Sequence, residues 1–104
     1  MMTTMKSVQG VPIRLSNERL AHIVRRHPEL AGEEAKIEET VHSPDSVQEG
    51  DAGSLIALRH YEKTSMNAKY CAVVYKEESA TDGFVLTAYL TRRPAKSRRV
   101  LWKR

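Results

Sequence analysis

Residues 69–93 read KYCAVVYKEESATDGFVLTAYLTRR and contain two long runs rich in β-branched and aromatic residues. Runs of this composition are typical of β-strands, and Asp82 and Gly83 between them provide a turn. A connection this short joins antiparallel neighbours, because a parallel pair needs a much longer crossover. The segment therefore predicts an antiparallel strand pair, around which the rest of the chain is arranged.

Two further strands and two helices are predicted before this pair. SVQEG (residues 46–50) and SLIALRHYEK (residues 54–63) have the same strand-like composition and are separated by turn residues. Residues 17–27 repeat apolar side chains at helical spacing, and residues 33–42 begin with acids, which favour a helix N-terminus. The sequence thus predicts an α+β fold in which two N-terminal helices pack on one face of an antiparallel sheet of about four strands.

Length and composition indicate a single folded domain over residues 1–104. Apolar residues make up 40% of the chain and charged residues 29%, which is ordinary for a folded protein. Residues 1–10 are expected to form a flexible N-terminus. Neither a membrane span nor a signal peptide is indicated, so we expect a cytoplasmic protein.

The one cysteine, Cys71, lies in an apolar run and is expected to be a buried structural thiol.

Charge is distributed unevenly along the chain. Residues 92–104, RRPAKSRRVLWKR, contain seven Lys or Arg and no acid, so the net charge of +4 leaves −3 on residues 1–91. The acids are concentrated between Glu33 and Asp51. This asymmetry favours a nucleic acid or an acidic protein as partner over an uncharged metabolite. Trp102, within the basic stretch, is available to stack on a base.

The segment LAHIVRRHPEL (residues 20–30) places two histidines on the first predicted helix. The apolar stripe of that helix contains Leu20, Ile23, Val24 and His27. His22 lies on the opposite, polar side together with Arg25 and Arg26. Residues five apart on a helix are turned by about 140°, so the two imidazoles cannot bind one metal ion as a pair four apart could. No metal site and no cofactor are predicted.

Polar and basic side chains recur on the predicted strands. One side of residues 83–93 carries Thr87, Tyr89 and Thr91, and the other, expected to pack under the helices, carries Phe84, Leu86, Ala88 and Leu90. Arg59 and Tyr61 share one side of residues 54–63, and Lys69 begins the next strand. The convergence of Arg59, Lys69 and Thr87 on one face is a hypothesis, because register cannot be read from one sequence. RNA cleavage without a metal needs a base, an acid and fixed cations, and this set provides them together with a helix histidine.

Three segments together are similar to a known group of nucleases. They are RLSNERLAHIVRRHPEL (residues 14–30), which contains H-x-x-x-R-H-P-E; LRHY and KYCAVVYK on two strands; and GFVLTAYLTRR followed by a basic stretch ending in LW. The chain resembles the barnase/EndoU/colicin/RelE-like nuclease superfamily, in particular its small bacterial and phage-associated members. The resemblance covers about residues 11–102.

This resemblance implies two helices followed by a four-stranded antiparallel sheet, and a metal-independent endoribonuclease acting on the sheet face away from the helices. Members commonly act as toxins held by an antitoxin, or as effectors aimed at competitors. By position, the family's histidines, cations and hydroxyl correspond to His22, His27, Arg59, Lys69 and Thr87. The acidic second helix departs from a fully basic nuclease, so the substrate groove must lie away from residues 33–39.

The leading hypothesis is a toxin-type, metal-independent endoribonuclease that leaves a 2′,3′-cyclic phosphate. Its candidate catalytic residues are His22, His27, Arg59, Lys69, Thr87 and Tyr89. Its candidate substrate-binding residues are Arg26, Tyr61, Thr91, Arg92 and Arg93. Either histidine would serve as base or acid, the cations would hold the phosphate, and the hydroxyls would position it or donate a proton. The expected partners are RNA and an antitoxin or immunity protein, without a membrane.

Two other classes of function stay open. One is a non-catalytic nucleic-acid-binding module that uses the basic C-terminal stretch while the polar strand face stays idle. The other is a protein-interaction domain whose acidic second helix binds a basic partner. Cleavage of RNA separates the first hypothesis from both.

Overall fold

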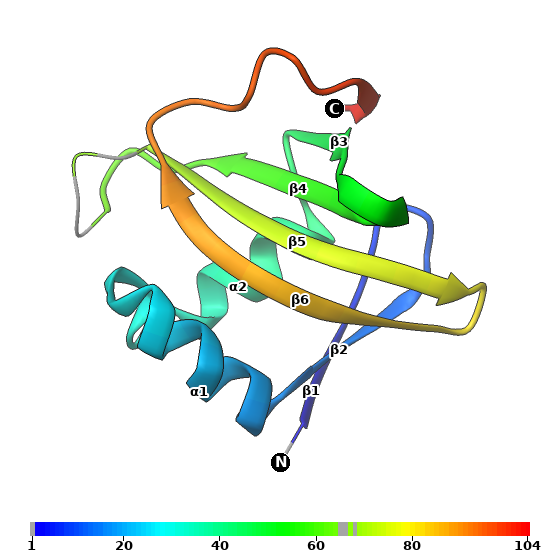
Figure 1. Cartoon of the computed structure of the whole chain (residues 1–104), viewed down its shortest axis with the longest axis horizontal. Coiled ribbons are helices and arrows are strands. Elements are labelled where there is room, and N and C mark those ends of the chain that lie inside the picture. The colour runs from blue at the N-terminus through cyan, green and yellow to red at the C-terminus, as the bar shows by residue number, and fades with distance from the viewer. Residues whose placement is uncertain (1, 65–66, 68) are drawn as a thin grey trace.

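The two long strands predicted within residues 69–93 form the centre of the sheet (Figure 1). β5 (Tyr70–Ser79) and β6 (Asp82–Thr91) pair in antiparallel fashion over nearly their full length. Their register shifts between Val74 and Tyr75, where β6 contains the extra residue Leu86. Side chains alternate between the two faces of a strand, so this bulge changes which face the following residues of β6 occupy.

The computed structural model describes residues 2–64, 67 and 69–104, and these form a seven-stranded sheet in the order β1-β2-β6-β5-β4-β3-β7. The other strands are β1 (Met2–Lys6), β2 (Pro12–Ser16), β3 (Ser46–Glu49), β4 (Leu55–His60) and β7 (Val100–Lys103). β2 runs parallel to β6, and the other pairs are antiparallel. The expected four-stranded antiparallel sheet after two helices is therefore wrong. The fold is α+β, but its sheet is mixed, has seven strands and begins before the first helix.

A hairpin of β1 and β2 occupies the N-terminal region, of which residues 1–10 are expected from the sequence to be flexible. Val11, Ile13 and Leu15 are buried and alternate with more exposed residues, as in a strand with one covered face. Gly10 in the connecting turn has a φ of +82°, which glycine adopts without strain. β1 has a single buried apolar residue, Met5. The strand signal in β1 is therefore weak, and the hairpin was missed.

The basic C-terminal stretch contributes β7 at the far edge of the sheet. Trp102 pairs with Val47 of β3, so it is a strand residue rather than part of a solvated tail. Because β6 and β7 are separated by β5, β4 and β3 in the sheet, the connecting residues 92–99 must cross these strands. Figure 1 shows this connection running from the end of β6 across to the C-terminal strand.

Both predicted helices are confirmed within one residue of their expected bounds. α1 (Asn17–Arg26) begins at Ser16, whose Oγ accepts a hydrogen bond from the Arg19 amide at 3.0 Å. It ends before Pro28, which cannot continue a helix because it lacks a backbone N–H. α2 is Glu34–His42. Short 3-10 helices lie at Pro28–Leu30 (η1) and Asp51–Gly53 (η2).

The helices occupy different places relative to the sheet. α2 packs on one face, against β1, β4 and β5, and Figure 1 shows it behind the sheet. α1 lies beside β6, where the Arg19 guanidinium donates to the Leu86 carbonyl at 3.4 Å. In the described part of the chain, no helix is long and apolar enough to cross a membrane.

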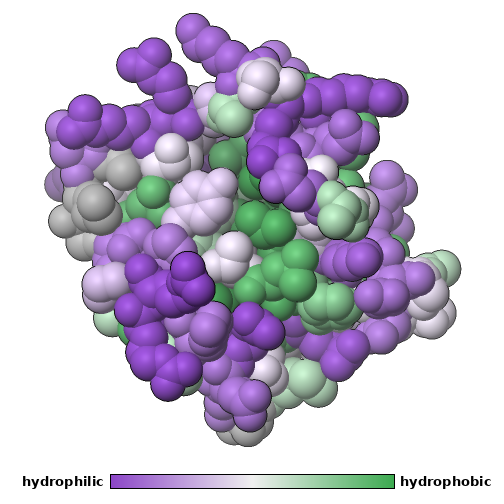
Figure 2. All heavy atoms as spheres, viewed as in Figure 1, coloured by the Kyte–Doolittle hydropathy of each residue, from purple (hydrophilic) through white to green (hydrophobic). Residues whose placement is uncertain are grey.

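Apolar residues gather on both faces of the sheet. On the face away from α2, Ile56, Leu58 and Ala72 form a small cluster, with Val74 and Tyr89 packed against it. Figure 2, drawn in the same view as Figure 1, shows an apolar strip across this face with hydrophilic residues around it. This face therefore combines an apolar floor with a polar surround.

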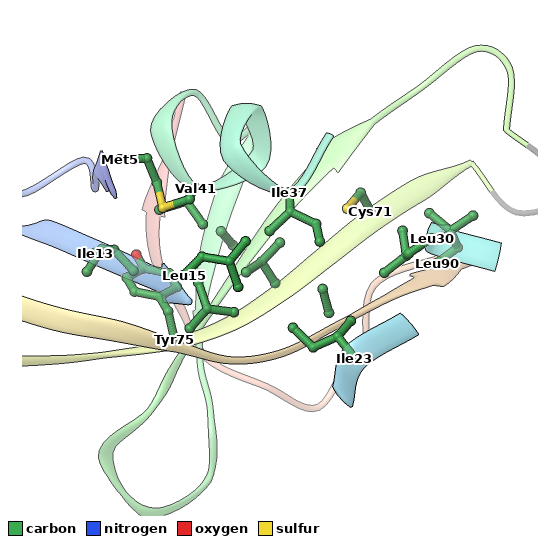
Figure 3. Packing of buried hydrophobic residues seen from close by; sticks show 14 of the residues in the cluster. Met5, Ile13, Leu15, Ile23, Leu30, Ile37, Val41, Cys71, Tyr75 and Leu90 are labelled. Carbon is green, nitrogen blue, oxygen red and sulfur yellow. The ribbon is translucent and has the colours of Figure 1, made fainter. Parts of the chain in front are cut away.

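The main core lies between the sheet and the helices (Figure 3). It includes Ile23 from α1, Ile37 and Val41 from α2, and Tyr75 from β5, each 0% exposed. Residues of the N-terminal hairpin extend the same cluster. Burial of apolar surface is the dominant favourable term in folding, so this cluster holds α1, α2 and the hairpin to the sheet.

The packing of α1 can be tested at Ile23. Ile23→Ala should lower the free energy of unfolding by about 2–5 kcal/mol, because it removes buried surface and leaves a cavity. Arg25→Ala, at an exposed position of the same helix, should change it by less than about 0.5 kcal/mol. Urea denaturation followed by circular dichroism measures both variants. Equal stability of the two would contradict the described packing.

Candidate functional site

The face of the sheet turned away from α2, called the open face below, carries the candidate site. Its floor is the small apolar cluster around Ile56 and Leu58. Thr87 and Tyr89 of β6 pair with Val74 and Ala72 of β5 respectively, which belong to this face, and Thr91 follows two residues later. The predicted grouping of the β6 hydroxyls on one side is therefore confirmed.

Residues 92–99 border the open face and are fastened to it. Gln48 of β3 is 5% exposed, and its side-chain amide donates to the Ala95 carbonyl at 3.0 Å. Arg98 Nη1 donates to Asp51 Oδ1 at 3.1 Å, and this hydrogen bond and the charge of Asp51 raise the pKa of Arg98 above its usual value. The connection is thus held at both β3 and η2 rather than projecting into solvent.

Two adjoining hollows lie between this connection and the sheet, with volumes of about 160 and 520 Å³. The smaller is bounded by Tyr89 and Thr91, and the larger by Tyr70 at the start of β5. Both are lined by Gln48, Arg98 and residues 93–95, so the two hollows adjoin and are treated together as one groove. We call it the open-face groove.

The open-face groove carries positive charge. The cations that line its larger part are Arg93, Lys96, Arg98 and Lys103. Asp45 is the one acid among the described residues lining it, and its carboxylate is paired with Arg104 at 2.6 Å. A groove with excess cations and an apolar floor is suited to phosphates joined to flat apolar groups.

His27 reaches the open face from the end of α1. It is the C-cap residue of that helix, and its ring centroid lies 5.9 Å from that of Tyr89. Its Nδ1 is 3.6 Å from Glu29 Oε2, and the His27 side chain is 32% exposed. The imidazole is therefore accessible, adjacent to a phenol of the open face, and beside a carboxylate that attracts it when it is protonated.

His22 and Arg26 are not drawn into the open-face groove. His22 lies in a separate hollow of about 210 Å³ that is lined by Ser16, Glu18, Arg19 and Arg25. These residues all belong to α1 and its N-cap, so no described residue of the basic connection takes part in that hollow. Arg26 is exposed in the last turn of α1. Among the described residues, His27 has a ring contact with Tyr89 of β6, and His22 lies in this separate hollow.

Arg59 and Tyr61 lie on the helix side. Arg59 Nη1 donates to the Ser43 carbonyl at 2.5 Å, and its Nε is 3.4 Å from Glu39 Oε1. The Tyr61 hydroxyl donates to the same Glu39 oxygen at 2.6 Å, and its ring lies between Arg59 and Lys36. Burial raises the pKa of Tyr61 well above its usual value, and the hydrogen bond to Glu39 adds to the shift. These side chains fasten α2 to β4.

The expected convergence of Arg59, Lys69 and Thr87 on one face is wrong. Arg59 pairs with Cys71 and Thr87 with Val74, and these two β5 residues point to opposite faces because they are an odd number of positions apart. Lys69 is exposed in the β4–β5 connection, where its Nζ donates to the Glu62 carbonyl at 2.7 Å. Strand register, which the sequence does not reveal, decides this outcome.

The arginines predicted to bind substrate stand at the start of the connection. Arg93 lines both parts of the open-face groove, and Arg92 is exposed next to it. Gln48 and Tyr70 also line the groove but were not predicted as site residues. The sequence does contain a signal for Tyr70. It is separated from Ala72 and Val74 by two and four positions, so the three side chains share one face of the strand.

The described residues contain no group of three or more His, Cys, Asp or Glu placed to hold a metal ion. Comparisons of the chain with protein-family models, curated proteins and solved structures return no match. The resemblance to the nuclease superfamily therefore rests on the quoted segments and stays a prediction.

Cys71 is buried and should be unreactive in the folded protein. It is 0% exposed, and burial raises its pKa to about 11, so at pH 8 it carries on the order of a hundredfold less thiolate than a free cysteine. Labelling with a thiol reagent at pH 8 should be slow in the native protein and fast in urea. Equal rates in the two conditions would contradict this burial.

Arg59→Ala tests the structural placement of that arginine. The Ser43 carbonyl loses its donor and Tyr61 loses a stacking partner, so the free energy of unfolding should fall by about 1–3 kcal/mol. Lys69→Ala, at an exposed position, should change it by less than about 0.5 kcal/mol. Urea titration of the two variants measures the difference, and the reverse order would contradict the placement.

Proposed function

We propose that the protein is an endoribonuclease that cleaves RNA on the open face. One observation carries the proposal: the His27 imidazole lies next to Tyr89 on the strand that leads directly into the basic connection lining the groove. Tyr89 thus lies in the same hollow as Arg93 and Arg98, with the His27 imidazole beside it, and this arrangement supports the proposal. The quoted resemblance to metal-independent nucleases gives independent support.

The proposed reaction is transesterification at a ribose. The 2′-oxygen attacks phosphorus, the bond from phosphorus to the 5′-oxygen breaks, and a 2′,3′-cyclic phosphate forms. One proton leaves the 2′-hydroxyl for a base, and one proton passes from an acid to the departing 5′-oxygen. His27 serves in one of these roles and the Tyr89 hydroxyl in the other. Arg93 stabilises the charge that develops on the phosphorane, and the Thr91 hydroxyl, which donates to the Arg93 carbonyl at 3.1 Å, holds the backbone of Arg93 in place.

The geometry changes the set of residues that we propose. His27, Thr87, Tyr89, Thr91 and Arg93 remain, because they border the open face. Arg59 and Tyr61 are left out, since their polar groups are engaged with α2 on the other side of the sheet. His22, Lys69, Arg26 and Arg92 are kept only as peripheral contacts to a longer RNA.

A toxin-type role in the cytoplasm follows from the same proposal. A nuclease without an absolute metal requirement acts on the RNA of its own cell unless it is held inactive. An antitoxin or immunity protein with an acidic surface could cover the positive groove, because charge complementarity favours such an association.

A non-catalytic nucleic-acid-binding module is the second candidate. The specific observation in its favour is that Arg93, Lys96 and Lys103 form no salt bridge or side-chain hydrogen bond with the described part of the chain. Unpaired cations give salt-dependent affinity for any polyanion, whether or not cleavage follows.

The decisive assay incubates the purified protein with mixed RNA in EDTA. Cleavage should persist and give 2′,3′-cyclic phosphate ends, and His27→Ala should slow it by about 10²–10⁴-fold through loss of proton transfer. His42→Ala is the matched control, because His42 lies at the end of α2 and contacts the Lys6 carbonyl. Both variants are first shown to unfold like the parent.

Three results would count against the proposal. Loss of all cleavage in EDTA would contradict the metal-free mechanism. Equal activity of His27→Ala and the parent would remove the imidazole from the mechanism. Salt-sensitive binding of RNA without any product would leave the binding module as the function.

A further inference from the structure

The larger part of the open-face groove has the features of a nucleotide site. We propose that it holds one unpaired nucleotide of single-stranded RNA, with the base against Tyr70 and a phosphate on Arg93 and Lys96. This inference rests on the proposed function, because it assigns a neighbouring nucleotide of the same substrate. Apart from Arg93, which borders both parts of the groove, the residues of this subsite take no part in the proposed chemical step.

Size and shape fit a nucleotide. The hollow has a volume of about 520 Å³, within the range of about 300–1,000 Å³ that is usual for small-molecule sites. It lies between β3 and residues 93–98, and Pro94, Ala95 and Val100 give it apolar walls. A base can be shielded from water on these walls while its phosphate stays at the rim.

Tyr70 provides a fixed aromatic wall. Its ring meets that of His60 edge-to-face, with centroids 5.2 Å apart and planes at 75°. The His60 amide in turn donates to Asp45 Oδ2 at 2.7 Å. Because the His60 ring packs against that of Tyr70 and the His60 backbone is held by Asp45, the Tyr70 ring loses less freedom when a base stacks on it than an isolated ring would.

Charge in the hollow is suited to a phosphate. Arg93 and Lys96 have no salt bridge or side-chain hydrogen bond with the described residues, so they are free to contact a ligand. Arg98 already holds Asp51, and Asp45 is neutralised by Arg104. The uncompensated charge is therefore positive and lies in the same hollow as Tyr70.

The substrate must be single-stranded at this point. A base in the hollow would lie between residues 93–95 and β3, so we expect a base that is free of a pairing partner to fit there better than a base pair. The hollow adjoins the smaller one, which is bounded by Tyr89 and Thr91, because the two share lining residues. Adjacent nucleotides of one strand can therefore occupy the two parts together, which is how proteins commonly bind unpaired RNA.

The test measures binding of a fluorescent 2′-O-methyl RNA hexamer, which cannot be cleaved by attack of the 2′-oxygen. Tyr70→Leu should raise Kd by about tenfold through loss of stacking, whereas Tyr70→Phe, which keeps the ring, should stay within about twofold. Lys96→Ala should reduce the slope of log Kd against log salt by about one, and Lys6→Ala, a cation on β1 at the far edge of the sheet, should not.

The experiment tests the nucleotide subsite and the nuclease activity separately. Equal affinity of Tyr70→Leu and the parent, or a duplex bound as tightly as the hexamer, would overturn the subsite even if RNA is cleaved. Ring-dependent binding of the hexamer without cleavage of natural RNA would support the subsite and overturn the nuclease.

Discussion

The register between β5 and β6 is the constraint on which both faces of the sheet depend. Val85 and Thr87 are two residues apart and would share a face in a regular strand. The extra residue Leu86 separates them, so Val85 enters the core at 2% exposure while Thr87 stays on the open face. The expected grouping of Phe84 with the core residues fails for the same reason. One inserted residue thus allows β6 to contribute both to the core and to the groove.

Elements with strong local signals could be predicted from the sequence, and those held by distant partners could not. α1 has a capping residue and helical spacing, α2 has acids at its start, and β3 to β6 have clear strand composition, so their bounds agree closely with prediction. β1 and β7 are short, and each is a strand because of one neighbour. The parallel pairing of β2 with β6 joins residues about seventy positions apart, which no local pattern encodes.

For the candidate site too, features set by local spacing could be predicted, whereas features set by distant partners could not. Alternation within β6 correctly grouped Thr87 with Tyr89, because faces within a strand follow from spacing alone. Whether Arg59 lies on the same face of the sheet as Thr87 depends on how the strands pair. Both faces of the sheet carry apolar residues, so composition does not show which face Arg59 occupies. Ile56 and Leu58 resemble core residues, yet they form the floor of the open face. Apolar residues under a groove and apolar residues under a helix look alike in sequence.

The sheet separates the charges that the sequence shows as two blocks. The acids of α2 lie on the covered face, where Glu39 binds Arg59 and Tyr61 and Glu34 accepts from Thr3. The cations of residues 92–99 lie on the other face, held by Gln48 and by the pairing of β7 with β3. A connection fixed in this way places its free cations before a ligand arrives, so binding need not order a mobile loop. The buried Gln48 amide, although it carries no charge, therefore helps to fix where these cations stand by holding the Ala95 carbonyl between Arg93 and Lys96.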